Sequence, residues 1–190
     1  MKYHKTSLEI KKEAEVIEKA KKDSSAFKPI YESYFPQLSA FIYKRLDDKE
    51  VVFDIVQKTF VKALEKLHKY EFRGLPFSSW LYRIAINELN QYFRSQNRLR
   101  TVNLESSEVN RLFSDVDDSI YDEDQIQMLK TSLKYLSSSD YLMIEMRYFE
   151  ERPFKEIAQI LEITETNAKV KTYRAMDKLK KVVLKLQAAA

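Results

Sequence analysis

The sequence has no cysteine, one glycine and four prolines among its 190 residues. The lack of cysteine excludes disulfide bonds and thiolate zinc sites, and it fits a reducing, cytoplasmic location. The scarcity of glycine and proline is typical of long helices joined by few tight turns. There is no run of about 18 or more apolar residues, so we expect no membrane insertion. The first residues lack the apolar segment of a secretion signal, so we expect none.

The charges that are present are unevenly distributed, although the net charge is only +4. Lys plus Arg against Asp plus Glu gives 7 against 5 for residues 1–26 and 13 against 8 for residues 27–100. The same count gives 1 against 8 for residues 101–127 and 12 against 8 for residues 128–190. Basic blocks thus flank an acidic one, which suggests two nucleic-acid-binding domains on a linker that avoids the nucleic acid.

Apolar residues recur at helical spacing and no persuasive period-two alternation occurs, so we predict an all-α fold. Residues 1–26 have a weak apolar stripe and are expected to form a mobile or partner-dependent arm. Residues 27–100 are predicted to form one small helical domain, and residues 128–190 a second. Residues 101–127 are acidic and rich in Ser, Asp and Asn, which is typical of a flexible linker.

In the first domain we predict helices at residues 27–46, 51–70 and 79–100, with Ser78 or Ser79 as the N-cap of the last one. The middle helix has one apolar face and one polar face. Its predicted inward residues are Val52, Val56, Phe60, Ala63 and Leu67. Its predicted outward residues are Asp54, Gln57, Lys58, Val61 and Glu65, among which Val61 is apolar and so can mark a partner surface.

The stretch from Phe72 to Arg100 holds the only glycine, Gly74, and the only tryptophan, Trp80. In its helix, one face carries amides and arginines and no carboxylate. That face comprises Arg83, Asn87, Asn90, Arg94 and Asn97, with Trp80, Gln91 and Arg98 beside them. Such groups pair bidentately with base edges and phosphates. The alternative is an ordinary amphipathic core helix whose outer face is basic by chance.

The loop before this helix favours nucleic acid. Phe72 and Phe77 flank Arg73 and a turn at Gly74 and Pro76, so the loop can hold an unstacked base against aromatic rings.

In the second domain we predict helices from residue 126 to 136, from Asp140 to Phe149 with a cap at residues 137–139, and from Phe154 to Leu161. A three-residue turn leads to a last helix that ends near Leu186, which is a helix-turn-helix pattern. On this last helix Ala168, Thr172, Ala175, Met176 and Leu179 are predicted to face inward. A recognition face is predicted at Thr166, Asn167, Lys169, Val170, Lys171, Tyr173 and Arg174. The alternative is an ordinary helical hairpin with a lysine-rich face.

Both basic blocks carry motifs of one family. Asp54–Phe60 (DIVQKTF) resembles a D-x-V-Q-x-x-F helix. Phe72–Gly74 (FRG), Trp80–Asn87 (WLYRIAIN) and Arg94 resemble the signature that follows it. Glu156–Ala158, Leu161 and Lys169–Ala175 resemble a helix-turn-helix signature. The chain therefore resembles RNA polymerase sigma factors of the extracytoplasmic-function (ECF) type. Departures at Gln91 and residues 166–171 leave the promoter sequence unassigned.

The resemblance implies a non-enzymatic subunit that binds core RNA polymerase, recognises promoter DNA and helps open it without a cofactor. Polymerase binding is implied for Asp54, Gln57, Lys58 and Val61. Capture of the minus-ten element as single strand is implied for Phe72, Arg73, Gly74, Phe77, Trp80, Arg83, Asn87, Gln91 and Arg94. Reading of the minus-thirty-five element is implied for the recognition face of the last helix. The linker would thread the polymerase cleft, or serve as a solubilising spacer. An anti-sigma factor of unknown identity is a further expected partner.

Three other functions remain open. A two-headed regulator would bind duplex DNA without polymerase. A helical enzyme is disfavoured, because a single glycine excludes Gly-rich phosphate loops and two distant histidines do not make a metal centre. The third is an adaptor protein, whose lysine-rich faces would be exposed to solvent without binding DNA.

Overall fold

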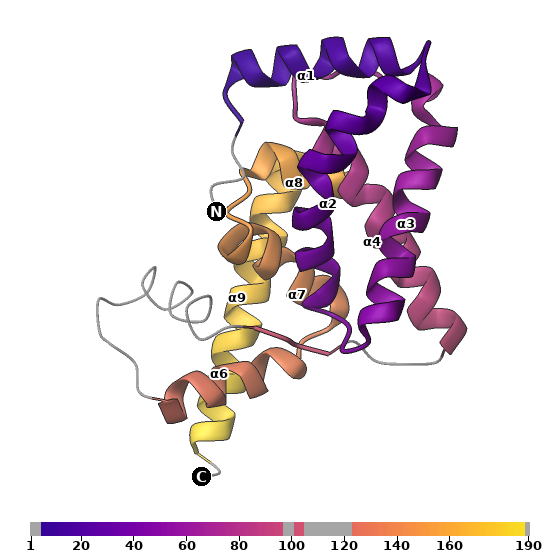
Figure 1. The fold of residues 1–190 in the computed structure, drawn as a ribbon. Helices are drawn as coiled ribbons and strands as arrows, with labels where there is room; N and C mark the ends of the chain where they lie inside the picture. The colour runs from indigo at the N-terminus through magenta and orange to yellow at the C-terminus, as the bar shows by residue number, and fades with distance from the viewer. Residues whose placement is uncertain (1–4, 97–100, 105–122, 189–190) are drawn as a thin grey trace. The chain divides into compact units, whose positions relative to one another are not determined.

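The computed structural model describes residues 5–96, 101–104 and 123–188, and every regular element in these ranges is a helix (Figure 1). The prediction of an all-α fold is confirmed. By its internal contacts the chain divides into two compact units, His4–Thr101 and Val102–Ala190. Most of the predicted linker, residues 105–122, lies outside the described residues, as do Asn97 and Arg98 of the predicted amide and arginine face.

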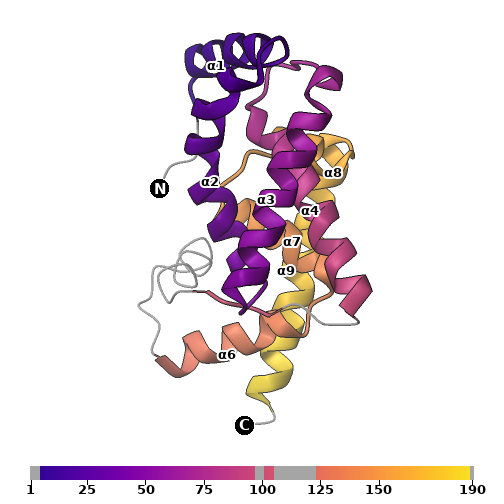
Figure 2. The same ribbon diagram turned by 45° about the vertical axis from the view of Figure 1, so that its right-hand side comes forward.

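The N-terminal unit is a helical bundle with one helix across its end. It comprises α1 (Ser7–Ala20), a 3-10 turn (Ser24–Phe27), α2 (Lys28–Tyr43), α3 (Lys49–Glu65), a second 3-10 turn (Leu67–Lys69) and α4 (Phe77–Gln96). Helices α2, α3 and α4 run side by side, and α1 lies across one end of them, as Figure 1 and Figure 2 both show. The loop of residues 71–76 therefore lies beside α1.

The core of this unit is built from the predicted apolar stripes. Every residue predicted to face inward on α3 is buried, including Leu67 in the following turn. Tyr82 of α4 packs on Phe41 of α2 with ring centroids 4.6 Å apart. Fully burying a side chain of this size stabilises a fold by roughly 1.5–3 kcal/mol relative to leaving it exposed. This packing fixes which face of α3 and of α4 is left for solvent and partners.

Helix α1 is packed against the rest of the unit, whereas residues 1–26 were expected to form a mobile or partner-dependent arm. Its start has a capping box, in which Thr6 N donates to Glu9 Oε2 at 2.7 Å and Glu9 N donates to Thr6 Oγ1 at 3.3 Å. Ile17 and Ala20 are buried, and so is the carboxylate of Glu13. The stripe looked weak because one of its inward positions is an acid rather than an apolar residue.

The start of α4 also differs from the prediction. Ser78 and Ser79 are buried inside the first turn, so neither is the N-cap. The helix begins at Phe77, whose N–H donates to Glu13 Oε2 at 2.8 Å. A carboxylate from α1 thus performs the capping role that the sequence assigned to a local serine.

The C-terminal unit is built on one long helix. It comprises α6 (Glu123–Lys134), α7 (Ser138–Ile144), a π-helical turn (Glu145–Phe149), α8 (Phe154–Leu161) and α9 (Glu165–Gln187), with α6, α7 and α8 all packed on α9. Because α6 begins at Glu123, residues 123–127 of the predicted linker are helical. The cap predicted at residues 137–139 is confirmed, since Asp140 N donates to Ser137 Oγ at 3.1 Å.

The turn between α8 and α9 has the predicted length. Glu162 ends α8 in the left-handed region, with φ 54°, and Thr164 caps α9 by accepting from Asn167 N at 3.2 Å. Small side chains allow α9 to approach its neighbours closely, and Ala168 and Ala175 are fully buried. This geometry sets the outward face of α9.

Candidate nucleic-acid interfaces

The outer face of α4 presents the predicted amides and arginines. Asn87, Gln91 and Arg94 are exposed, and Arg83 is half-buried. The opposite face anchors the helix, because Leu81, Tyr82, Ala85, Ile86 and Leu89 are all buried. The face is therefore held at a fixed rotation and is open to a ligand.

A carboxylate borders this face. Glu88, half-buried on α4, accepts from Lys62 of α3 at 2.6 Å. The pair lies at a groove of about 460 Å³ between α3 and α4, which Gln91 also lines together with Asp54 and Lys58. Because Lys62 offsets the charge of Glu88, the acid adds little repulsion to the adjacent amide face. The groove also joins one residue predicted to bind DNA with two predicted to bind polymerase, a juxtaposition that the sequence did not predict.

The loop of residues 71–76 presents an aromatic side chain at a sharp turn. Gly74 has φ 70° in open space, so the backbone conformation, and not crowding, favours glycine there. Phe72 is 42% exposed, and Arg73 is exposed beside Glu71. Phe72 is therefore available to a base.

Phe77 is not available, which corrects its assignment as a base-stacking residue. It is 1% exposed and packs against four aromatic rings. The rings of Phe27, Tyr34, Tyr70 and Trp80 lie with centroids 5.1–6.4 Å from that of Phe77. Phe77 supports the loop from within, and half-buried Trp80 closes the cluster beside Tyr70.

The predicted outward face of α3 carries more apolar surface than expected. Asp54 pairs with Lys58 at 2.6 Å, and Gln57 donates to the hydroxyl of Tyr31 at 3.0 Å. Val61 is 52% exposed, as predicted, and the exposed side chains of Phe53 and Leu64 share its face. Phe53 and Leu64 were not predicted to share this face, although their spacing from Gln57 and Val61 is helical. An apolar face with polar neighbours is typical of a protein-binding surface.

The inward and outward residues of α9 lie as predicted. Ala168, Thr172, Ala175 and Leu179 are buried and Met176 is half-buried. All of the outward residues are exposed: Thr166, Asn167, Lys169, Val170, Lys171, Tyr173 and Arg174. One face of α9 thus presents cations, an amide and a phenol to solvent.

A cation–aromatic cluster, which was not predicted from the sequence, extends this face beyond α9. The guanidinium of Arg147 lies 4.9 Å from the ring centroid of Phe154, and Lys169 Nζ lies 5.9 Å from the same centroid. Phe154 also packs against Tyr173, with centroids 6.3 Å apart. Arg147 from the π-helical turn and Lys169 from α9 therefore stand over one ring, which suits both to a phosphate backbone.

In the described parts of the chain, no group of three or more His, Cys, Asp and Glu side chains is placed to hold a metal ion. No helix there is long and apolar enough to cross a membrane.

Two family models match this chain: Sigma-70 region 2 over residues 30–99 and Sigma-70, region 4 over residues 126–179. The ECF RNA polymerase sigma factor BldN of Streptomyces coelicolor is 25% identical over 171 residues, which are 89% of this chain and 65% of BldN. The ECF RNA polymerase sigma factor SigM of Bacillus subtilis is 26% identical over 152 residues, which are 80% of this chain and 91% of SigM.

Among solved structures, the sigma factor RpoE from Bartonella quintana, in complex with the anti-sigma factor NepR, has a similar fold. The TM-score is 0.56 at 23% identity, over 83% of this chain and 96% of RpoE. The fold and the matched regions together define a sigma-70 protein with regions 2 and 4. The chain belongs to the ECF type of RNA polymerase sigma factors, and its function lies in transcription initiation.

Proposed function

We propose that this chain binds core RNA polymerase, recognises the minus-thirty-five and minus-ten promoter elements through its two units, and promotes opening of the DNA without catalysing a covalent reaction. The observation that carries the proposal is the pair of exposed faces on α4 and α9. Both combine amides with cations, and each is fixed in rotation by a buried opposite face. Cations position a phosphate backbone, while amides read base edges.

In this proposal α9 reads duplex DNA. Helix-turn-helix proteins place the N-terminal part of the second helix in the major groove. Asn167, Lys171 and Arg174 occupy that part of α9 and are exposed. Arg147 and Lys169, held over the ring of Phe154, contact phosphates at the edge of the groove. The N-terminal half of α9 is thus assigned to the minus-thirty-five element.

The α4 face and the loop take the opened strand. Unstacking a base costs a few kcal/mol, and stacking on an aromatic ring returns about 1–3 kcal/mol per base. Phe72 supplies the exposed ring, while Asn87, Gln91 and Arg94 supply donors and acceptors along the same unit. Binding to the single strand therefore stabilises the opened state without hydrolysis.

The polymerase-binding surface is the α3 face of Asp54, Gln57, Lys58 and Val61, enlarged by Phe53 and Leu64. The apolar centre supplies burial, and the polar residues supply orientation. Since RpoE is described in complex with an anti-sigma factor, we also include an anti-sigma factor among the partners of this chain.

Two amide variants test the assignment of the faces. Starts of transcription are first mapped with the wild-type chain and core polymerase, and one mapped promoter is used thereafter. Asn87→Ala is expected to reduce permanganate reactivity of the opened strand, while the holoenzyme still binds the duplex minus-thirty-five fragment. Asn167→Ala is expected to weaken that duplex binding by roughly 1–3 kcal/mol, the value of one base contact.

Each variant is the control for the other, because both remove one exposed amide from a helix. Random initiation or no initiation by the wild type would refute the proposal. Tight, specific duplex binding by the chain without polymerase would favour the free regulator instead.

A further inference from the structure

The loop of residues 71–76 is attached to α1 at its first end. Lys21, the C-cap of α1, donates to the carbonyl oxygen of Tyr70 at 2.8 Å and lies 5.9 Å from the centroid of the Tyr70 ring. Glu18 of α1 accepts from the same ammonium at 2.7 Å. Tyr70 itself is buried, so this carbonyl is the last fixed point before the chain enters the loop.

The other end of the loop is attached to α1 by Glu13. One oxygen of the Glu13 carboxylate accepts from the Phe77 N–H at 2.8 Å. The other accepts from the Tyr34 hydroxyl at 2.6 Å and from Lys5. Burial and the nearby Glu13 carboxylate raise the pKa of Tyr34 well above its ordinary value, so its hydroxyl remains a donor. Glu13 is 6% exposed, and a carboxylate so buried is tolerated only when donors surround it, as they do here.

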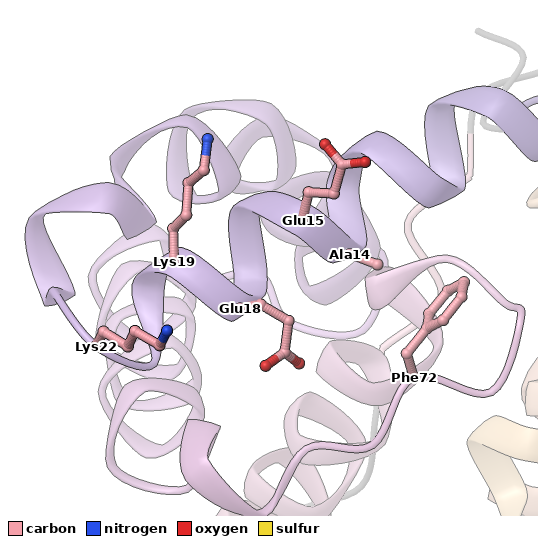
Figure 3. Close-up of a pocket in the computed structure, with 6 residues that line it drawn as sticks. All are labelled: Ala14, Glu15, Glu18, Lys19, Lys22 and Phe72. Carbon is pink, nitrogen blue, oxygen red and sulfur yellow. The ribbon is translucent and has the colours of Figure 1, made fainter.

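Phe72 lies against the same helix. Figure 3 shows its ring beside Ala14 of α1, in a groove that Glu15, Glu18, Lys19 and Lys22 also line. Both ends of the loop and the side chain at its start therefore face one helix. A loop of six residues that is fixed at both ends has little conformational freedom left, so less conformational entropy is lost when it binds DNA.

We propose that α1 is the positioning element of this loop: Glu13 and Lys21 hold the ends of residues 71–76 so that Phe72 is presented in a conformation ready for an unstacked base. Glu13 and Lys21 touch no DNA in this scheme and act only through the loop. The inference rests on the proposed function for the role of the loop in DNA opening. The attachment of the loop by α1 is tested independently of that function.

The first experiment is hydrogen exchange of the free, full-length chain, followed by mass spectrometry. Glu13→Leu and Lys21→Met each remove one attachment. We expect amide exchange in residues 70–77 to quicken about tenfold, because a hydrogen bond to a charged group contributes roughly 1.5 kcal/mol and 1.4 kcal/mol is a factor of ten. Glu32→Leu and Lys11→Met are matched controls, since both residues are exposed in the same unit outside the groove of Phe72 and each change removes the same charge.

The second experiment measures opening by the holoenzyme on a promoter mapped with the wild-type chain. Glu13→Leu and Lys21→Met are expected to lower permanganate reactivity at least about threefold relative to their controls, while binding to the minus-thirty-five duplex is unchanged. Lys21→Arg retains a donor and is expected to restore most of the opening. A merely structural role would not separate opening from duplex binding in this way.

Unchanged exchange in residues 70–77 for both variants would overturn the attachment by α1. Faster exchange with undiminished opening would overturn the positioning role. If Glu13→Leu does not fold, Lys21→Met, at the rim of the unit, decides both points. If the wild-type holoenzyme opens no promoter, the proposed function fails and the positioning role fails with it, while the exchange result still decides the attachment.

Discussion

Lys178 of α9 donates to both carboxylate oxygens of Asp140, at 3.0 and 2.8 Å. Asp140 stands in the first turn of α7, where a negative charge is favourable, and it also accepts from the hydroxyl of Ser137 at 2.6 Å. The contact joins α7 to the middle of α9, beyond the recognition face. Lys178 is therefore a structural cation of the C-terminal unit.

Asp140→Asn is expected to destabilise the C-terminal unit by about 1 kcal/mol, since a partly exposed ion pair and one cap are weakened. Burial alone would raise the pKa of Asp140, but hydrogen bonds from Lys178 and Ser137 and the charges of Lys178 and Lys171 lower it below its ordinary value. A lowered pKa contributes stability that is present above about pH 4, the unfolded value, and is lost as the pH falls through the folded value.

Thermal unfolding of wild type and Asp140→Asn between pH 3 and 7 measures this contribution. The difference between the two chains is expected to be constant above about pH 5 and to shrink below about pH 4. A difference that does not change with pH would contradict the assignment.

Glu162→Gly is expected to stabilise the chain by about 1 kcal/mol. Glu162 has φ 54° at the end of α8, and a side chain in the left-handed region costs roughly 1–2 kcal/mol, of which part is offset by the greater freedom of glycine when unfolded. Urea denaturation measures the gain. Glu162→Ala is the control, because it removes the same carboxylate but keeps the Cβ atom, and it should give no such gain.

Phe72 and Phe77 are expected to differ sharply when each is changed to alanine. Phe77→Ala empties a site surrounded by four rings and should cost about 3–5 kcal/mol of stability. Phe72→Ala should cost only about 0.5 kcal/mol, because the side chain is half in solvent, yet it should reduce promoter opening. Stability is measured by circular dichroism during urea unfolding, and promoter opening is measured by permanganate footprinting. Equal stability losses would contradict the structure.

These two residues show which features could be predicted from the sequence and which could not. The periodicity of α3 and α9 correctly separated inner from outer residues, because each helix buries one continuous stripe. The loop could not be resolved in this way, since two phenylalanines near a turn look alike. Phe77 is inward because α4 starts there, and that start depends on Glu13, 64 residues away.

Other errors have the same origin. The burial of α1 depends on an acid that finds donors only in the folded unit, so hydrophobic periodicity understated it. The cluster of Arg147, Phe154 and Lys169 joins three elements of the C-terminal unit. No local sequence pattern predicts such a tertiary contact. By contrast, Phe53 and Leu64 were recognisable by their spacing on α3.

Val61→Asp is expected to weaken binding to core polymerase at least about tenfold, because a charge is placed in the apolar centre of the α3 face. Stability should change little, since Val61 is largely in solvent. Affinity is measured by titrating polymerase into labelled chain. Leu8→Asp is the matched control, because Leu8 is an exposed apolar residue on α1. A similar loss in both variants would indicate a general effect of charge.

Lys171→Ala is expected to reduce the dependence of duplex binding on salt. Removing one cation from a DNA phosphate lowers the slope of log affinity against log salt by about 0.9. Binding of the holoenzyme to the duplex minus-thirty-five fragment is measured over a series of potassium chloride concentrations. Lys180→Ala is the control, since Lys180 is exposed on the same helix beyond the proposed DNA-binding region. An unchanged slope for Lys171→Ala would place that side chain off the DNA backbone.

The packing of Trp80 beside Tyr70 and Phe77 has a practical consequence. The chain has a single indole, and it is located where the loop joins α4. Intrinsic fluorescence, excited selectively, therefore reports on this junction alone. In the chain without polymerase, binding of a single-stranded oligonucleotide at this junction can therefore be followed in real time without a label.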